Sequence, residues 1–192
     1  MKWLFTKITD ITHEQYTQIF SRLSPSRKAH IIRMKLPQDQ MRSLAASFLV
    51  EKLLKENGYN NFTLSNKENG MPYLEGSNLF VSISHSAEGV VCAISETTIG
   101  IDIEKIKTVT EKFINYVCND KEKEYIFAEP TALPQRFFAV WTAKEAYLKK
   151  HGLQLGDIRT IDTFSFEKQF YTTEDFLITI VSKISSYISL LK

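Results

Sequence analysis

The 192-residue sequence predicts an α+β protein with two similar halves that meet near residue 100. Helical segments followed by strand-like segments occur twice along the chain, and three strand-like segments lie close together in residues 79–104. Apolar residues make up 43% and charged residues 24%, which is ordinary for a globular protein with a sizeable core. The net charge of +2 argues against a general nucleic-acid-binding protein. No sequence repeat marks the two halves, so their division depends on the order of the elements.

The N-terminal part of the chain predicts one strand and two helices. Residues 2–10 have the apolar centre of a strand. Thr12 and Gln15 have the spacing of a capping box, which predicts a helix to about residue 23. A longer helix is expected over 37–57, because its apolar residues repeat at helical spacing and Asn-Gly follows. The densest basic run of the protein, 27–35, lies between these helices.

The middle and C-terminal parts predict further strands around a long helix. We expect strands at 62–64, 72–74, 79–86, 90–95 and 99–104, helices at 111–118, 120–127 and 135–150, and strands at 163–166 and 176–181. Asn69-Gly70 is an expected turn, and Gly152 is an expected helix end. The three strands between 79 and 104 suggest a meander. Residues 184–191 show no pattern that assigns them.

Neither the cysteines nor the N-terminus indicates secretion or a redox site. Cys92 and Cys118 lack metal-ligand or redox spacing, so both are expected to be buried free thiols. The N-terminal apolar run is too short and too polar for a signal peptide, and no stretch reaches the length of a membrane span. We therefore expect a cytoplasmic protein.

The segment Ile99-Gly100-Ile101-Asp102-Ile103-Glu104 alternates strictly between apolar isoleucines and other residues. This is the period of a half-buried strand, and it brings the two carboxylates together on one face. Like charges at that distance repel unless a cation or a proton accompanies them. Mg²⁺, which prefers oxygen ligands and phosphates, is a suitable partner. The alternative is a strand end whose acidic residues face water.

The expected helix at 135–150 carries a second charged cluster within an aromatic face. At about 100° per residue, Lys144 and Glu145 fall in the same arc as several aromatic residues. Buried charges are costly unless they are paired, so a local ion pair at the edge of the core is one interpretation. The other is that Glu145 is a third metal-directed carboxylate, with Lys149 one turn further on to hold a phosphate.

These segments carry a resemblance to a known family. Residues 99–104 and 141–149 match G-[IV]-D-[IV]-E and W-x-x-K-E-[AS]-x-x-K, the two signatures of the 4′-phosphopantetheinyl transferases, in the same order and spacing. Residues 80–86 are similar to the family's F-N-[IV]-S-H-S, with Ser or Val in place of Asn. Gly70-Met71-Pro72 stands where the family usually has G-K-P. The resemblance covers about residues 20–170, and the length suggests the Sfp-like subgroup.

The resemblance implies an architecture and a reaction. The fold would consist of two pseudo-symmetric halves, 1–98 and 99–192, each a small antiparallel sheet packed with a long helix, with the active site at their interface. Enzymes of this family transfer the phosphopantetheine arm of coenzyme A to a serine of an acyl or peptidyl carrier protein. The other product is adenosine 3′,5′-bisphosphate, and Mg²⁺ is required. The expected partners are coenzyme A and the carrier, without nucleic acid or membrane, and a monomer is expected.

The resemblance also implies roles for particular residues. Asp102, Glu104 and Glu145 would hold Mg²⁺, and Glu145 would also take the proton from the carrier serine. Lys149 would bind the transferred phosphate, whereas Lys144 would either contact phosphate or only orient the helix. The expected ligands of coenzyme A are Ser84, His85, Ser86, Arg42, Gly70, Pro72 and, as a weaker candidate, Lys28.

Met71 is a departure from the family pattern, because a thioether cannot replace the phosphate-binding lysine. Lys67 or the 27–35 run is expected to compensate, or affinity for coenzyme A is lower. This departure keeps open a non-catalytic module that binds coenzyme A or a nucleotide. A third reading is an unrelated Mg²⁺-dependent phosphohydrolase, although the sequence offers no clear motif for an activated water or nucleophile.

Overall fold

The computed structural model describes residues 1–60, 62–67, 70–173 and 175–183. It contains two three-stranded antiparallel sheets and a two-stranded hairpin. The N-terminal sheet has the order β1 (Lys2–Lys7), β5 (Gly89–Ser95), β4 (Phe80–Ser86). The C-terminal sheet has the order β6 (Ile99–Lys105), β8 (Phe176–Ser182), β7 (Gln169–Thr173). The hairpin joins β2 (Thr63–Asn66) and β3 (Pro72–Glu75).

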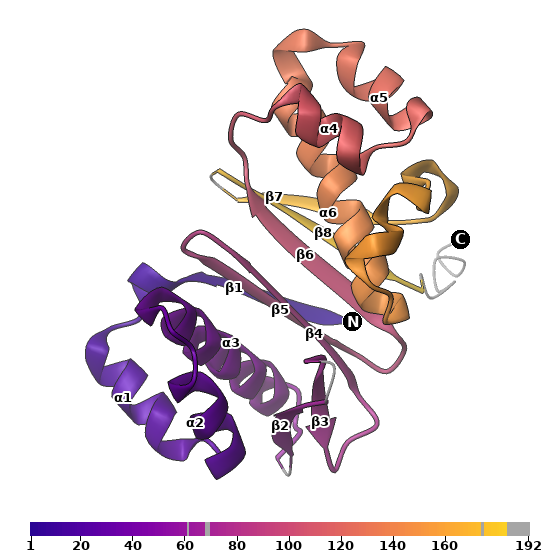
Figure 1. Ribbon diagram of the computed structural model, residues 1–192. Helices are drawn as coiled ribbons and strands as arrows, with labels where there is room; N and C mark the ends of the chain where they lie inside the picture. Colours follow the sequence, from indigo (N-terminus) through magenta and orange to yellow (C-terminus); the bar gives the residue numbers. More distant parts are fainter. Residues whose placement is uncertain (61, 68–69, 174, 184–192) are drawn as a thin grey trace, which may run out of the picture.

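The two sheets face each other between two layers of helices (Figure 1). Alternate side chains explain this arrangement, since each strand sends successive residues to opposite faces. Ile99, Ile101 and Ile103 of β6 pack against Val91 and Ala93 of β5 in one buried cluster. The outer face of the N-terminal sheet packs on one long helix, and the outer face of the C-terminal sheet packs on the other. This confirms the expected α+β fold of two sheets packed with helices.

The N-terminal helices are α1 (His13–Arg22), α2 (Pro25–Ile32) and α3 (Pro37–Glu56). The predicted capping box is present: the Thr12 side chain accepts a hydrogen bond from the backbone N–H of Gln15, whose side chain returns one to Thr12. The basic run folds mainly as α2, with Ser24 as its N-cap and proline at the first helical position. A segment expected only as a basic run is therefore a helix that presents one face to the cleft between the halves.

The C-terminal helices are α4 (Glu111–Val117), α5 (Asp120–Phe127) and α6 (Leu133–His151). Gly152 ends α6 in a left-handed conformation with φ of 66°, as the sequence predicted. Short 3₁₀ helices, η3 (Leu155–Thr160) and η4 (Thr163–Ser165), follow it. Within the described part of the chain, no helix is both long and apolar enough to cross a membrane.

Several predicted elements are corrected. The strands from 79 to 104 do not form a meander, because β6 pairs with β8 and joins the other sheet. Residues 163–166 do not form a strand, because the 3₁₀ helix η4 begins there. The second strand that pairs with β8, on the side away from β6, is β7. The first strand ends at Lys7, and Ile8–Asp10 forms the 3₁₀ helix η1. Asn69 of the expected 69–70 turn and residues 184–191 lie outside the described residues.

Serine side chains join the two sheets where β4 and β6 run side by side. Ser82 accepts a hydrogen bond from the backbone N–H of Ile101 at 3.0 Å. Ser84 donates to Asp102 at 2.6 Å, and Ser86 donates to Glu104. The seam between the halves is therefore built from hydroxyl groups rather than from a backbone ladder.

Gly100 allows α6 to lie directly on β6. A Cβ atom at this position would collide with the carbonyl oxygen of Ala146 and crowd the backbone nitrogen of Lys150. Any side chain would therefore force the helix away from the strand. This contact brings the Asp102 and Glu104 face of β6 opposite α6, which is the structural reason for glycine in the alternating segment.

Candidate active site

A cavity of about 420 Å³ opens at the boundary between the two halves. From the C-terminal half its lining includes Asp102, Glu104, Trp141, Glu145 and Lys149. From the N-terminal half its polar lining residues are Arg27, His30, Ser43, Asn66, Ser84 and His85. We call this the central cavity. It unites the residues of both signature segments, although they are separated by about forty positions in the sequence.

Asp102 lies at the bottom of this cavity and is only 4% exposed. Its Oδ1 accepts hydrogen bonds from Ser84 Oγ and Lys149 Nζ, both at 2.6 Å. Its Oδ2 is buried and has no hydrogen-bond partner among the described residues. An unpaired buried carboxylate oxygen is costly. The free oxygen therefore has a coordination position to offer to a ligand that carries positive charge.

Glu104 lies two residues further along the same face of β6. Its Oε2 accepts a hydrogen bond from Ser86, and its Oε1 accepts one from the indole N–H of Trp141 at 3.2 Å. Burial raises the pKa of Glu104 above its ordinary value, and the negative charge of Asp102 adds to that effect, whereas the two hydrogen bonds oppose it. The two hydrogen bonds thus fix the orientation of the carboxylate, but its ionised form is destabilised unless a cation is nearby.

Glu145 faces the same cavity from α6. Burial, followed by the charge of Asp102, raises its pKa to about 7, and Lys149 opposes the shift. A carboxyl group with a pKa near neutrality is suited to accept a proton at physiological pH. Glu145 has no hydrogen-bond partner of its own among the described side chains, so its position follows from the position of α6.

These carboxylates are the ligand type that a hard divalent cation prefers, but their present positions do not form a complete coordination site. Three carboxylates line one cavity, and Asp102 Oδ2 is left without a partner. Oxygen donors of this kind are the ligands that Mg²⁺ prefers. In residues 1–60, 62–67, 70–173 and 175–183, however, no three acidic, histidine or cysteine side chains stand close enough to hold a metal as placed. Lys149 Nζ instead neutralises Asp102.

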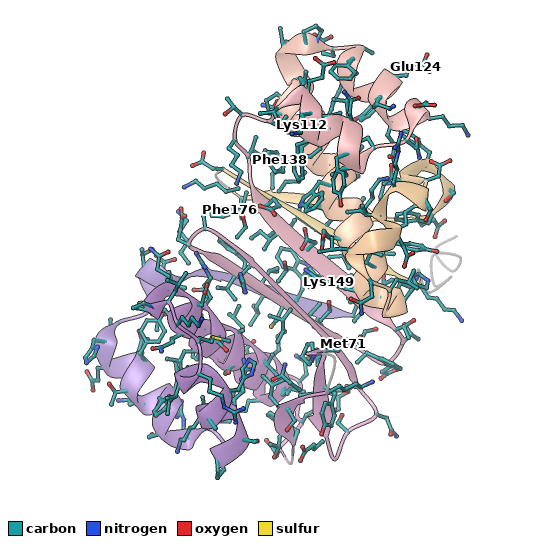
Figure 2. The ribbon with its side chains drawn as sticks, viewed as in Figure 1. Met71, Lys112, Glu124, Phe138, Lys149 and Phe176 are labelled. Carbon is teal, nitrogen blue, oxygen red and sulfur yellow. The ribbon has the colours of Figure 1, made fainter. Side chains whose placement is uncertain are left out.

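Lys149 is the cation of the cavity's C-terminal wall. Besides Asp102, it donates to Ser84 Oγ at 2.8 Å, and its side chain is 29% exposed. It also lines an adjoining groove of about 740 Å³, together with Met71, Phe80 and Lys150. Figure 2 shows Lys149 at the end of α6 and Met71 on the opposite side of the boundary. The ammonium group can therefore reach a ligand in either space.

The expected coenzyme A ligands divide into those that line the central cavity and those that do not. Ser84, His85, Gly70 and Pro72 line it. Desolvation, followed by the charges of Arg42 and Lys149, lowers the pKa of His85 below its ordinary value, so its ring is neutral at pH 7. Ser86 is turned toward β6, where Glu104 accepts its hydroxyl proton.

Arg42 and Lys28 are not in the cavity lining. Arg42 pairs with Asp39 at 2.6 Å and donates to the carbonyl oxygen of Ala87 at 2.7 Å, in the turn that joins β4 to β5. Lys28 points to α1, where its ammonium group donates to the carbonyl oxygen of Ser21 at 2.8 Å. Lys28 therefore stays a prediction without support from this geometry, because the face of α2 that meets the cavity carries Arg27 and His30.

Arg27 and His30 are the cavity residues that the sequence did not single out. Arg27 is 6% exposed, and it donates to Ser43, Ser47 and Asn66. No carboxylate pairs with its guanidinium among the described ion pairs, and burial lowers its pKa to about 10. The signal was the three-residue spacing of 27 and 30, which places both on one face of a helix.

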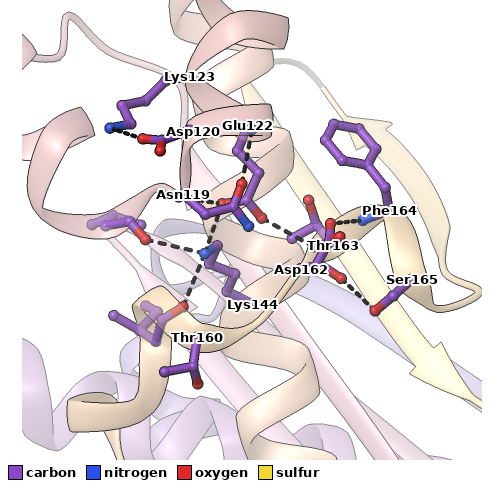
Figure 3. A network of polar contacts seen from close by, with 12 residues as sticks. Asn119, Asp120, Glu122, Lys123, Lys144, Thr160, Asp162, Thr163, Phe164 and Ser165 are labelled. Carbon is purple, nitrogen blue, oxygen red and sulfur yellow. Dashed lines mark hydrogen bonds and ion pairs between the residues drawn. The ribbon is translucent and has the colours of Figure 1, made fainter.

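Lys144 does not reach the cavity. Its side chain is fully buried, and its ammonium group pairs with Glu122 at 2.7 Å and donates to the carbonyl oxygens of Val117 and Ile158 (Figure 3). An ammonium group has three protons, and all three are used here. The assignment of Lys144 as a phosphate contact is therefore corrected, and the alternative, orientation of the helix, is the one that this geometry favours.

Comparison with known proteins agrees with this architecture. The model of the 4′-phosphopantetheinyl transferase superfamily matches residues 98–187. The chain is 33% identical over 159 residues to the 4′-phosphopantetheinyl transferase gsp of Aneurinibacillus migulanus, an alignment that covers 79% of this chain and 66% of that protein. It is 26% identical over 160 residues to the 4′-phosphopantetheinyl transferase Sfp of Bacillus subtilis (strain 168), covering 81% of this chain and 70% of that protein.

A third relative carries the same description. The chain is 28% identical over 166 residues to the 4′-phosphopantetheinyl transferase HetI of Nostoc sp. (strain PCC 7120), covering 80% of this chain and 69% of that protein. The fold and the cavity define a two-half α+β protein with an acidic site at the boundary of its halves. The chain belongs to the 4′-phosphopantetheinyl transferase superfamily. It spans about two thirds of the length of these relatives.

Proposed function

We propose that this protein transfers the 4′-phosphopantetheine group of coenzyme A to a serine of an apo acyl or peptidyl carrier protein. The products are the holo-carrier and adenosine 3′,5′-bisphosphate. One observation carries the proposal: the acidic residues of β6 meet Glu145 and Lys149 of α6 in a single cavity, whose other wall carries the Arg27 guanidinium, imidazoles and hydroxyl groups. Family membership supports the same reaction.

The acidic wall supplies the metal ligands and the base. Asp102, Glu104 and Glu145 would hold Mg²⁺, which on binding would offset the charge of the pyrophosphate and of the leaving group. Glu145 takes the proton of the carrier serine as the serine oxygen attacks the phosphorus atom of the pantetheine-bearing phosphate. The bond from that phosphorus to the bridging oxygen breaks, and adenosine 3′,5′-bisphosphate leaves with the electron pair.

The cationic wall holds the other end of coenzyme A. Arg27, whose buried guanidinium has no carboxylate partner among the described residues, is suited to a phosphate at the nucleotide end, and the His30 imidazole beside it, whose pKa is lowered by burial and by the nearby arginines, can donate a hydrogen bond. We propose that these residues compensate for Met71. Lys149 exchanges its contact with Asp102 for the transferred phosphate and stabilises the charge that develops there.

The direct test is a mass measurement on the carrier. Several apo-carriers from fatty-acid, polyketide and peptide-synthetase systems are incubated separately with the protein, coenzyme A and Mg²⁺. A gain of about 340 Da, the mass of one phosphopantetheine arm, supports the transferase. Unmodified carriers with tight coenzyme A binding would instead indicate the non-catalytic binding module. Hydrolysed coenzyme A with unmodified carriers would indicate the phosphohydrolase.

Two further proposals concern the state of the protein. We propose a monomer, because both walls of the central cavity come from one chain. Sedimentation equilibrium that gives a mass near 22.2 kDa would support this, whereas a mass near twice that value would contradict it. With coenzyme A and carrier proteins as substrates, we also propose a cytoplasmic location.

A further inference from the structure

The buried ion pair of Lys144 and Glu122 has no part in the reaction proposed above. Both side chains are 0% exposed. Glu122 Oε2 accepts from Lys144 and from the backbone N–H of Asn119, and its Oε1 accepts from the backbone N–H of Thr163, each backbone bond at 3.0 Å. With the two carbonyl bonds of Lys144, the pair ties α6 to the end of α4, to the start of α5 and to the 3₁₀ helices η3 and η4 (Figure 3).

Stability alone does not account for such a pair. Removing two charges from water costs several kcal/mol per ion, and a well-packed apolar pair of similar volume is often as stable or more stable. An apolar pair does not define a single packing register, because apolar helix faces can pack in several neighbouring registers. A charged side chain with three fixed acceptors fits in one register only.

Register matters here because Glu145 directly follows Lys144. A slip of α6 by one residue would turn Glu145 about 100° away from the central cavity. Asp102 and Glu104 have hydroxyl, ammonium or indole partners that orient them. Glu145 has no such partner among the described residues, so only the placement of α6 directs it.

Two polar links between α6 and the site are not permanent in the proposed reaction, whereas the buried hydroxyl contact of Thr142 with Thr179 of β8, at 2.6 Å, lies outside the cavity lining. Lys149 would leave Asp102 for phosphate, and Trp141 donates to a carboxylate that would bind the metal. The Lys144–Glu122 pair lies away from the cavity and persists throughout. We propose that this pair is a positioning device that fixes the register of α6, and so the direction of Glu145, during turnover. The measurements of kcat for this inference depend on the proposed function, whereas the test of the position of α6 does not.

The decisive variant removes both charges together. Lys144→Met with Glu122→Leu leaves no unpaired ion, but two backbone N–H groups and two carbonyl oxygens lose their side-chain partners, so the urea midpoint is expected to fall. We expect kcat per folded molecule to fall by at least about tenfold, while KM for coenzyme A stays within about twofold, because only the base is misdirected. A purely structural role predicts instead a parental kcat per folded molecule, which would overturn the inference.

A second readout is independent of the reaction. The chain has two tryptophans, so Trp3→Phe leaves Trp141 of α6 as the sole reporter of the cavity face. In the double variant we expect acrylamide quenching of Trp141 to rise at least about twofold, since the bond to Glu104 is lost when α6 shifts. Unchanged quenching would overturn the inference even if the parent transfers nothing to any carrier, a result that would count against the proposed function alone.

The control is a core substitution in the same cluster that leaves the pair in place. Ile126 of α5 is 0% exposed and packs in the cluster that includes α6. Ile126→Ala is expected to lower the urea midpoint while kcat per folded molecule stays within about twofold of the parent. If the double variant does not fold, Glu122→Gln replaces it: it keeps the volume but removes the charge, and a parental kcat and Trp141 quenching for that variant would equally overturn the inference.

Discussion

The two walls of the central cavity come from halves of similar architecture and opposite chemistry. Each half places a long helix on a three-stranded antiparallel sheet. The N-terminal wall presents a buried guanidinium, two imidazoles and hydroxyl groups, whereas the C-terminal wall presents three carboxylates and Lys149. The shared architecture positions side chains at a boundary, and the chemistry depends on which residue types stand there. Neither wall contains all the groups that the proposed reaction needs.

The largest effect is expected on the acidic wall. Glu145→Gln removes the base and one metal ligand while keeping the volume, so kcat should fall by about 10²- to 10⁴-fold with the fold intact. Mass spectrometry of the carrier and circular dichroism measure the two properties. Glu124→Gln, an exposed carboxyl on α5, is the matched control and should retain parental transfer. A folded Glu145→Gln protein with undiminished transfer would remove Glu145 from the mechanism.

The next largest effect tests how the acidic wall is built. Gly100→Ala forces a Cβ against the backbone of α6, so we expect a loss of about 1–3 kcal/mol in the free energy of unfolding and a lower kcat. Urea denaturation gives the first value. Gly156→Ala has no atom within 4 Å of the added Cβ and should be neutral. Equal behaviour of the two alanine variants would mean that α6 does not need its close approach to β6.

The cationic wall is tested by a pair of neighbouring residues. Arg27→Met should raise KM for coenzyme A by about tenfold, because it removes the charge that has no carboxylate partner in the cavity wall. Lys28→Met, one position along but directed to α1, should change KM by less than about twofold. Steady-state kinetics at saturating carrier gives both numbers. The reverse order of effects would restore Lys28 as the ligand and reject the proposed face of α2.

The smallest effect is a pH dependence of stability. The pKa of Glu145 is about 7 in the folded protein, above its ordinary value of 4.5, so the folded state holds the extra proton between these values. The free energy of unfolding should therefore fall as pH rises from about 4.5 to 7, by on the order of 1–2 kcal/mol, without recovering above pH 7.

Glu145→Gln should lack this component. Urea unfolding at pH 5 and pH 8, without Mg²⁺, compares the two proteins under conditions where no metal competes for the carboxylate. We expect the free energy of unfolding of the parent to be lower at pH 8 than at pH 5 because of Glu145. In the variant this decrease should be absent, so the difference between variant and parent should favour the variant more at pH 8 than at pH 5. Parallel pH curves would show that burial and Asp102 do not perturb Glu145 as the geometry indicates.

Much of this molecule was predictable from local sequence patterns. The capping box of α1, the apolar period of α3, the alternation of β6 and the glycine that ends α6 all depend on near neighbours in the chain. The signature segments also identified the acidic residues that line the cavity. In these cases the spacing of residues carries the structural information directly.

What could not be predicted depends on distant contacts. The pairing of β6 with β8 rather than β5 is set by the packing of two sheets, which no short segment records. Lys28 and Arg27 are adjacent in the sequence, and only the docking of α2 decides which one faces the cavity. Likewise, Lys144 and Glu145 are neighbours in the sequence, but Lys144 is buried in an ion pair whereas Glu145 lines the cavity. The sequence does not reveal this difference, because the partner of Lys144 lies 22 positions away on α5.

The serine seam between β4 and β6 has a consequence for how the molecule can vary. Among the described residues, β4 and β6 share no backbone-to-backbone hydrogen bond, and serine hydroxyl groups make the links instead. Exchanging a single residue such as Ser82 would therefore change the joint while every strand keeps its own ladder. The geometry of the central cavity, which opens at this joint, is thereby separable from the integrity of each sheet.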